Sequence, residues 1–207
     1  MTTRPIKLPD GREITYKQAD AAVMDYVSST NHAAFQLYDL TNDGPHNEIR
    51  PIDVLSLNAL NAFTGSSPMA AMENLWRNKG KVETAVREVS RKPLDDFSEK
   101  QLPSEVGRLC EVLDVMLSIE LWGHTRVSKL LHRLRPNIAP IWDQFIGKWY
   151  AKHKRWPEFI AAVHTDVLGP NRVLLRRIEK KHGIPVLRVW DILLWKLGNE
   201  PKRWLNP

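Results

Sequence analysis

Three basic side chains within residues 120–150 have the spacing of a single helical face. Arg126, Lys129 and Arg133 follow one another at intervals of three and four residues, so a helix would align them as one basic stripe. Such a stripe either contacts the phosphates of a nucleic acid or forms a solvated helix face. Val127, Leu130, Leu131 and Leu134 form the apolar side of this helix, so we expect the basic stripe on its outer side.

A tight turn precedes this basic helix. Gly123, His124 and Thr125 lie between it and an apolar helix that starts at Pro103, which predicts a helical hairpin with a glycine in the turn. The first backbone N–H groups of a helix have no partner within the helix, and the helix dipole is positive at that end. The turn is therefore a candidate phosphate-binding site, together with the basic stripe.

Asp143 is the one acidic residue in the stretch 121–156, which also holds eight Lys and Arg residues. A carboxylate beside a sugar can stabilise the positive charge that develops when an N-glycosidic bond breaks, and it can orient the attacking water. Near the start of a helix, an aspartate also serves as an N-cap or as an ion-pair partner. Both roles stay open for Asp143.

The order of these features resembles the helix-hairpin-helix DNA glycosylase superfamily: a hairpin with a glycine, a basic helix, the crossover NIAPI, and an aspartate. The resemblance covers residues 120–150. It implies that the hairpin holds the phosphate backbone of double-stranded DNA and that Asp143, seventeen residues after Arg126, is the catalytic carboxylate. The pattern of the whole chain is also similar to an uncharacterised bacterial helical family.

The sequence departs from the glycosylase pattern in its hairpin. The family hairpin usually has Leu-Pro-Gly-Val-Gly, whereas residues 121–125 contain one glycine. Arg126 stands where bifunctional members carry a Schiff-base lysine, and a guanidinium stays protonated, so the implied enzyme is a monofunctional glycosylase without lyase activity. The resemblance also implies a pocket with aromatic walls for a flipped base. The tryptophans that flank the segment are candidates for these walls or are core residues: Trp122, Trp142 and Trp149.

Charge is distributed unevenly along the chain. Residues 1–120 hold 13 Lys and Arg against 18 Asp and Glu, a net charge of −5, whereas residues 121–207 hold 17 against 6, a net charge of +11. A basic field of this kind attracts polyanions, although a solvated basic face balanced by an acidic half has the same composition. A second basic run is either a further backbone clamp or solvated surface: Arg172, Arg176, Arg177, Lys180 and Lys181.

The pattern of apolar residues predicts an all-α fold. We expect one compact helical domain over residues 1–207, either undivided or bilobal with an acidic lobe over about 1–120 and a basic lobe over about 121–207. A small N-terminal hairpin is expected around Asp10–Gly11. Residues 31–48 are expected to form a long irregular loop, whose length hints at a function. For its residues Tyr38, Asp39 and Asp43, a structural role and a reach towards a flipped base both stay open. The helices are expected at about 16–28, 51–63, 68–78, 81–92, 103–121, 125–135, 141–154, 157–167, 171–182 and 185–197.

Several classes of protein and site are excluded or disfavoured by the sequence. The chain is 43% hydrophobic and 26% charged, as in globular domains, and it has no apolar run long enough to span a membrane. No signal peptide is recognisable, which favours the cytoplasm. The single cysteine, the seven scattered histidines and the lack of phosphate-binding glycine motifs predict neither a metal nor a cofactor.

Three functions are compatible with these features. The first is a glycosylase-like enzyme that uses Asp143, and the second is a non-catalytic DNA-binding module that keeps the hairpin as a phosphate grip. The third is a helical interaction protein whose basic face meets an acidic protein partner. The sequence indicates neither the base recognised nor the oligomeric state.

Overall fold

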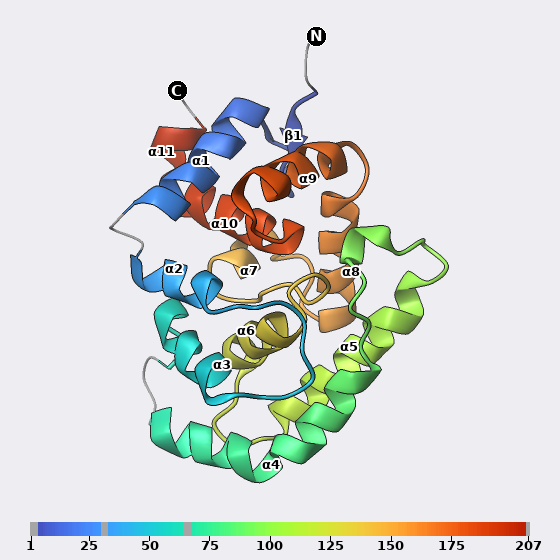
Figure 1. The fold of residues 1–207 in the computed structure, drawn as a ribbon. Helices are drawn as coiled ribbons and strands as arrows, with labels where there is room; N and C mark the ends of the chain where they lie inside the picture. The colour runs from blue at the N-terminus through green and yellow to red at the C-terminus, as the bar shows by residue number, and fades with distance from the viewer. Residues whose placement is uncertain (1–3, 30–32, 64–67, 206–207) are drawn as a thin grey trace. The chain divides into compact units, whose positions relative to one another are not determined.

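The computed structural model describes residues 4–29, 33–63 and 68–205, and most of them are helical (Figure 1). The predicted all-α fold is confirmed. The chain divides into two compact units: unit 1 combines Met1–His32 with Asp143–Pro207, and unit 2 is Ala33–Trp142. The lobe boundary expected near residue 120 therefore falls inside unit 2.

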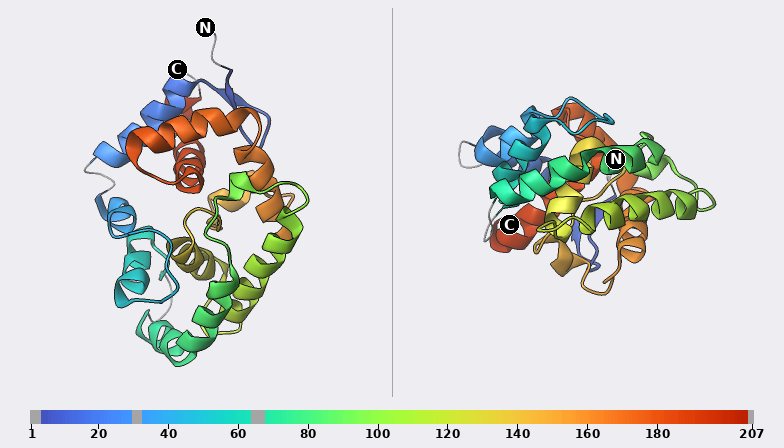
Figure 2. Two further views of the ribbon diagram at one scale, coloured as in Figure 1. Left: turned by 45° about the vertical axis from the view of Figure 1, so that its right-hand side comes forward. Right: turned by 90° about the horizontal axis from the view of Figure 1, so that it is seen from below.

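Unit 2 is built around one buried helix, α6. This helix contacts α3, α5 and η2, while α4 and α5 pack along each other (Figures 1 and 2). The elements of unit 2 in chain order are α2 (Ala33–Leu40), α3 (Pro51–Ser56), the 3-10 helix η2 (Leu57–Leu60), α4 (Pro68–Glu88), the 3-10 helix η3 (Leu94–Asp96), α5 (Leu102–Leu117) and α6 (His124–Leu134).

Unit 1 has a central helix of its own, α10, which contacts α1, α7, α8, α9 and α11. Trp190, Leu193 and Leu194 of α10 are at most 2% exposed, and each such side chain contributes about 1.5–3 kcal/mol when fully buried. The elements of unit 1 are β1 (Ile6–Lys7), β2 (Glu13–Ile14), α1 (Tyr16–Ser28), α7 (Ile146–Trp149), α8 (Trp156–Val167), α9 (Pro170–His182), α10 (Val186–Asn199) and α11 (Pro201–Trp204).

Local sequence signals account well for the start of unit 1. The hairpin expected at Asp10–Gly11 is present, with β1 and β2 antiparallel and Gly11 at a φ of 85°. The backbone of Lys7 exchanges two hydrogen bonds with the Asn171 side chain of α9, which attaches the hairpin to that helix. Thr15 then forms a capping box with Gln18 and fixes the first turn of α1.

Three expectations for the helices were wrong. The expected loop 31–48 contains the helix α2, because Tyr38 is fully buried and its hydroxyl donates to the carbonyl of Lys129. The expected helices 68–78 and 81–92 are one helix, α4, since burial of side chains on both sides outweighs the cost of about 1 kcal/mol for an internal Gly80. Of the helix expected over 141–154, only α7 forms.

Candidate functional site

The predicted hairpin consists of α5, a turn over residues 118–123 and α6. The left-handed residue of this turn is Leu121, with a φ of 68°, whereas Gly123 has an extended backbone with a φ of −95°. Gly123 and His124 are exposed, and Thr125 is half-buried. A role of these three residues in phosphate binding stays a prediction.

The basic stripe of α6 does not lie on an outer face. Arg126 is 9% exposed, Lys129 is 4% exposed and Arg133 is 0% exposed. The expectation of a solvent-facing stripe is therefore wrong for all three residues. Both the apolar side and the basic side of α6 are therefore buried. The apolar side makes apolar contacts, and the basic side makes polar contacts within unit 2.

Arg126 and Lys129 bind backbone carbonyls at the end of η2. The Nε atom of Arg126 donates to the carbonyl of Ala62 at 2.8 Å, and Nζ of Lys129 donates to the carbonyl of Leu60 at 2.7 Å. The Arg126 guanidinium also donates to the carbonyl of Leu121 in the hairpin turn. Burial lowers the pKa of Arg126. These two cations thus stabilise the end of a helix and the turn that leads into α6.

Arg133 makes the same kind of contact with α2. Its guanidinium donates to the carbonyl of Tyr38 at 2.5 Å and to the carbonyl of Thr41 at 2.7 Å, at the point where α2 ends. The guanidinium carbon also lies 5.3 Å from the centre of the Tyr38 ring. Cations are favoured at a helix C-terminus because its last carbonyls lack partners and carry partial negative charge.

Arg135 follows α6 and performs this role for α4. Its guanidinium donates to the carbonyls of Val86 and Val89, at 2.6 and 3.1 Å, where α4 ends. It also donates to the carbonyl of His46. Burial, with a smaller effect from the nearby Arg91, lowers the pKa of Arg135 to about 10, so the side chain stays charged at neutral pH.

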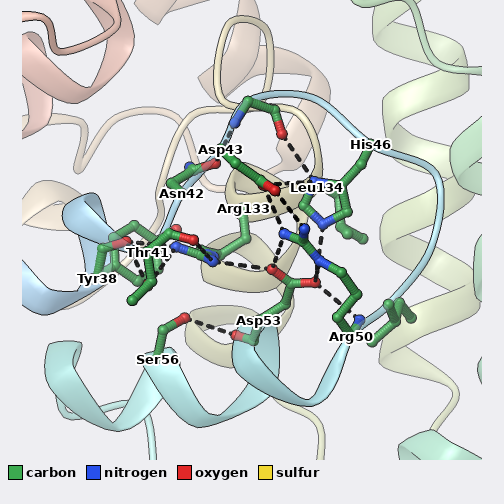
Figure 3. A network of polar contacts seen from close by, with 12 residues as sticks. Tyr38, Thr41, Asn42, Asp43, His46, Arg50, Asp53, Ser56, Arg133 and Leu134 are labelled. Carbon is green, nitrogen blue, oxygen red and sulfur yellow. Dashed lines mark hydrogen bonds and ion pairs between the residues drawn. The ribbon is translucent and has the colours of Figure 1, made fainter.

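Arg133 also connects to a buried ionic cluster around Asp53 of α3 (Figure 3). The Asp53 carboxylate is 0% exposed and accepts hydrogen bonds from Arg133 at 3.0 Å, from Nε2 of His46 at 2.9 Å and from Arg50 at 2.9–3.1 Å. Arg50 in turn makes two hydrogen bonds with the carboxylate of Asp43. The cluster ties the loop that follows α2 to α3 and α6.

The Asp53 cluster has the bonding of a structural clamp. Burial alone would raise the pKa of Asp53, but the hydrogen bonds from Arg50, His46 and Arg133 outweigh it and lower the pKa to about 2. Nδ1 of His46 lies 2.8 Å from the carbonyl of Gly44 and Nε2 lies 2.9 Å from the Asp53 carboxylate, so the ring links the loop to the cluster. Of the two roles left open for this loop, the geometry supports the structural one.

Asp143 begins the second segment of unit 1, whereas Arg126, Lys129 and Arg133 belong to unit 2. One carboxylate oxygen of Asp143 accepts hydrogen bonds from the backbone N–H groups of Phe145 and Ile146, at 2.8 and 3.0 Å. Asp143 therefore caps the turn that leads into α7, which is the structural alternative that its sequence position left open. Its assignment as a catalytic carboxylate stays a prediction.

The candidate aromatic walls have partners within their own units. Trp122 is 3% exposed and donates from its indole nitrogen to the carbonyl of Ala71, so it is a core residue of unit 2. Trp149 donates likewise to the carbonyl of Leu194 in unit 1. Trp142 is half-buried. Among the described residues, no group of His, Cys, Asp and Glu is arranged to hold a metal ion, and no helix is long and apolar enough for a membrane span.

The exposed basic residues are concentrated in unit 1. Over residues 4–29 and 143–205, thirteen Lys and Arg side chains are exposed, but only two acidic side chains are, Asp10 and Glu13. Over the described part of unit 2, seven exposed Lys and Arg are balanced by eight exposed Asp and Glu. The exposed basic residues of unit 1 are Arg4, Lys7, Arg12, Lys17, Lys148, Lys152, Lys154, Arg155, Arg177, Lys180, Lys181, Lys202 and Arg203.

A family model covers most of this structure. The model of a family of unknown function, DUF6308, matches residues 19–198, from α1 through unit 2 to α10. The chain belongs to this family. No curated protein and no solved structure gives a significant match to this chain.

Replacing Asp53 by Asn in the DUF6308 protein is expected to lower the free energy of unfolding by about 3–5 kcal/mol, because buried guanidinium groups lose their carboxylate. The folded-state pKa of about 2 lies below the ordinary 3.8, so the carboxylate stabilises the fold above about pH 4, and this contribution is lost toward pH 2. Urea unfolding followed by circular dichroism over this pH range measures both effects.

The matched control is Asp43→Asn, which removes a carboxylate of the same cluster whose side chain is 64% exposed. Exposed ion pairs contribute about 1 kcal/mol or less, so this variant is expected to stay close to the wild-type protein. Equal destabilisation by the two substitutions would contradict the central role of Asp53.

Asp143→Ala is expected to cost about 1 kcal/mol of stability, since the first backbone N–H groups before α7 lose their acceptor. Asp143→Asn keeps a side-chain carbonyl at this position, so a smaller loss is expected. Thermal unfolding of both variants checks this order. A fully stable alanine variant would show that the cap is unimportant.

Proposed function

We propose that this protein binds nucleic acid through exposed Lys and Arg side chains of unit 1. The observation that carries the proposal is the excess of thirteen exposed basic over two exposed acidic side chains in the described part of that unit. A surface of this kind creates a positive potential that attracts a polyanion. Contacts of Lys and Arg with phosphates supply most of the affinity of non-specific nucleic-acid binding.

The buried cations of unit 2 are not part of this proposal. Arg126, Lys129, Arg133 and Arg135 already donate to backbone carbonyls, and an approaching phosphate would have to displace those contacts. The positive charge of the segment 121–156 therefore divides into two roles. Four of its basic residues hold unit 2 together, and the other four belong to the exposed set of unit 1.

The distribution of the exposed charges favours a long, regular polyanion over a small anionic ligand. They occur on the N-terminal segment and α1, on α7 and the segment that follows it, on α9 and on α11, so they are spread over much of the unit. A membrane surface would also require exposed apolar side chains beside the cations. Among the described residues of unit 1, the exposed large apolar side chains are Met24 and Val173.

The proposal assigns binding and no reaction. A glycosylase needs a carboxylate at the sugar, and Asp143 bonds through one of its oxygens to the backbone before α7. The hypothesis of a monofunctional glycosylase therefore has less support in the geometry than the hypothesis of a DNA-binding module. An interaction with an acidic protein through the same surface is an outcome that the binding experiments below distinguish.

Binding of the wild-type protein to a labelled DNA duplex is expected to weaken steeply with salt. Each phosphate contact contributes about −0.9 to the slope of log K against log salt, so four contacts give about −3.6. Titrations followed by fluorescence anisotropy at several salt concentrations measure this slope. A slope near zero, or no binding at low salt, would overturn the proposal.

Two variants with equal changes in charge locate the binding surface. The unit 1 variant carries Lys152→Gln, Lys154→Gln, Arg177→Gln and Lys180→Gln, and the unit 2 variant carries Lys81→Gln, Arg87→Gln, Arg91→Gln and Lys100→Gln. All eight residues are exposed. Only the unit 1 variant is expected to lose affinity and salt dependence. Equal losses would assign binding to net charge rather than to unit 1.

A duplex with one cationic abasic-site analogue separates binding from glycosylase activity. The analogue carries the charge that develops on the sugar during base removal, so a glycosylase binds it more tightly than intact DNA. We expect the same affinity, within about twofold, for both duplexes. A strong preference for the analogue that disappears in Asp143→Asn would instead support the catalytic assignment of Asp143.

A further inference from the structure

The helix α9 presents a basic outer face of regular geometry. Its residues Asn171, Leu174, Leu175 and Ile178 are buried, and they define the side of α9 that packs against the rest of unit 1. At about 100° per residue, the opposite side is centred between positions 176 and 180. The apolar pattern of the helix therefore fixes which of its side chains point outward.

This outward side has a middle line and two edges. Val173 and Lys180 lie along the middle, and Val173 is 73% exposed. The half-buried Arg172 and Arg176 lie on one side of the exposed Lys180, with Arg176 nearer to it, and the exposed Arg177 and Lys181 lie on the other side. The face thus carries basic residues on both sides of an exposed apolar side chain.

Contacts within unit 1 fix the positions of several of these cations. The Arg177 guanidinium lies over the ring of Tyr16, 4.5 Å from its centre. Arg176 pairs with Glu179 at 2.8 Å, and Lys181 pairs with Asp20 at 2.6 Å. The five basic side chains of α9 and these two acidic partners together carry a net charge of +3.

We infer that α9 is the element that contacts nucleic acid and that the partner is a double helix, with α9 lying along its major groove. This inference rests on the proposed function. A helix with its side chains is about 10–12 Å across and the major groove of B-DNA is about 12 Å wide, so the helix fits between the two phosphate backbones.

The two edges of α9 match the two walls of such a groove. Arg172 and Arg176 face one backbone while Arg177 and Lys181 face the other, and the line between them faces the base edges. On binding, Arg176 and Lys181 exchange their surface ion pairs with Glu179 and Asp20 for phosphates. There Val173 contacts thymine methyl groups, and Lys180 donates to guanine acceptors or to a phosphate. Of the two roles open for the basic run 172–181, a backbone clamp and solvated surface, this assignment adopts the backbone clamp.

The first experiment divides the unit 1 variant into its two pairs. Arg177→Gln with Lys180→Gln removes two charges from α9, and Lys152→Gln with Lys154→Gln removes two charges from the segment between α7 and α8. We expect the α9 pair to lose about tenfold or more in duplex affinity and about 2 in salt slope. The second pair is expected to change affinity by less than about threefold, because it lies outside the contact.

A second comparison tests the middle line of the face. Val173→Asp places an acid on α9, whereas Met24→Asp places one at the other exposed large apolar position in the described part of unit 1, on α1. We expect a loss of about tenfold for Val173→Asp and at most about threefold for Met24→Asp. Circular dichroism and thermal unfolding of each variant verify that it is folded, since Arg177→Gln also removes the contact with Tyr16.

The outcomes separate the inference from the proposed function. Equal losses from both pairs, or wild-type binding to single-stranded DNA that matches duplex binding, would overturn the assignment of α9 to a duplex groove while leaving nucleic-acid binding in place. Failure of the wild-type protein to bind any nucleic acid would overturn both. Binding to polyglutamate as tight as to duplex DNA would also overturn both, in favour of an acidic protein partner.

Discussion

Unit 2 depends on contacts between cationic side chains and the carbonyl ends of its own helices. Arg126 and Lys129 bind carbonyls at the end of η2, Arg133 binds those at the end of α2, and Arg135 binds those at the end of α4. The final carbonyls of a helix have no partner within it, and leaving such groups buried and unpaired costs about 1–3 kcal/mol each. One short segment thus meets this requirement for three helices.

The same constraint explains why Asp53 is buried. Arg133 carries a charge into the interior, and a fully buried charge is tolerated when it is paired and hydrogen-bonded. Asp53 supplies the paired carboxylate, and its oxygens accept further hydrogen bonds from His46 and Arg50 of the loop after α2. The loop, α3 and α6 therefore form one bonded assembly, in which removal of a single partner leaves buried charges uncompensated.

These contacts change the functional meaning of the positive charge. Unit 2 has 13 basic and 14 acidic residues, and unit 1 has 17 and 10, so the net charges are −1 and +7. The excess belongs to unit 1 and lies mainly on its surface, where α9 carries the most regular array. The proposed nucleic-acid contact therefore fits unit 1, whereas the basic side chains of α6 make internal contacts of unit 2.

The sequence by itself determined the helical class, the hairpin at Asp10–Gly11 and the capped start of α1 at Thr15, because turn residues, caps and apolar periodicity act over a few neighbouring positions. It also marked Arg126, Lys129, Arg133 and Asp143 as unusual. Only the tertiary structure decided that the first three are buried, since the carbonyls they bind come from residues 38–62, which the chain brings near by folding. Periodicity distinguishes two sides of a helix, but it does not show whether the polar side meets water or the polar ends of other helices.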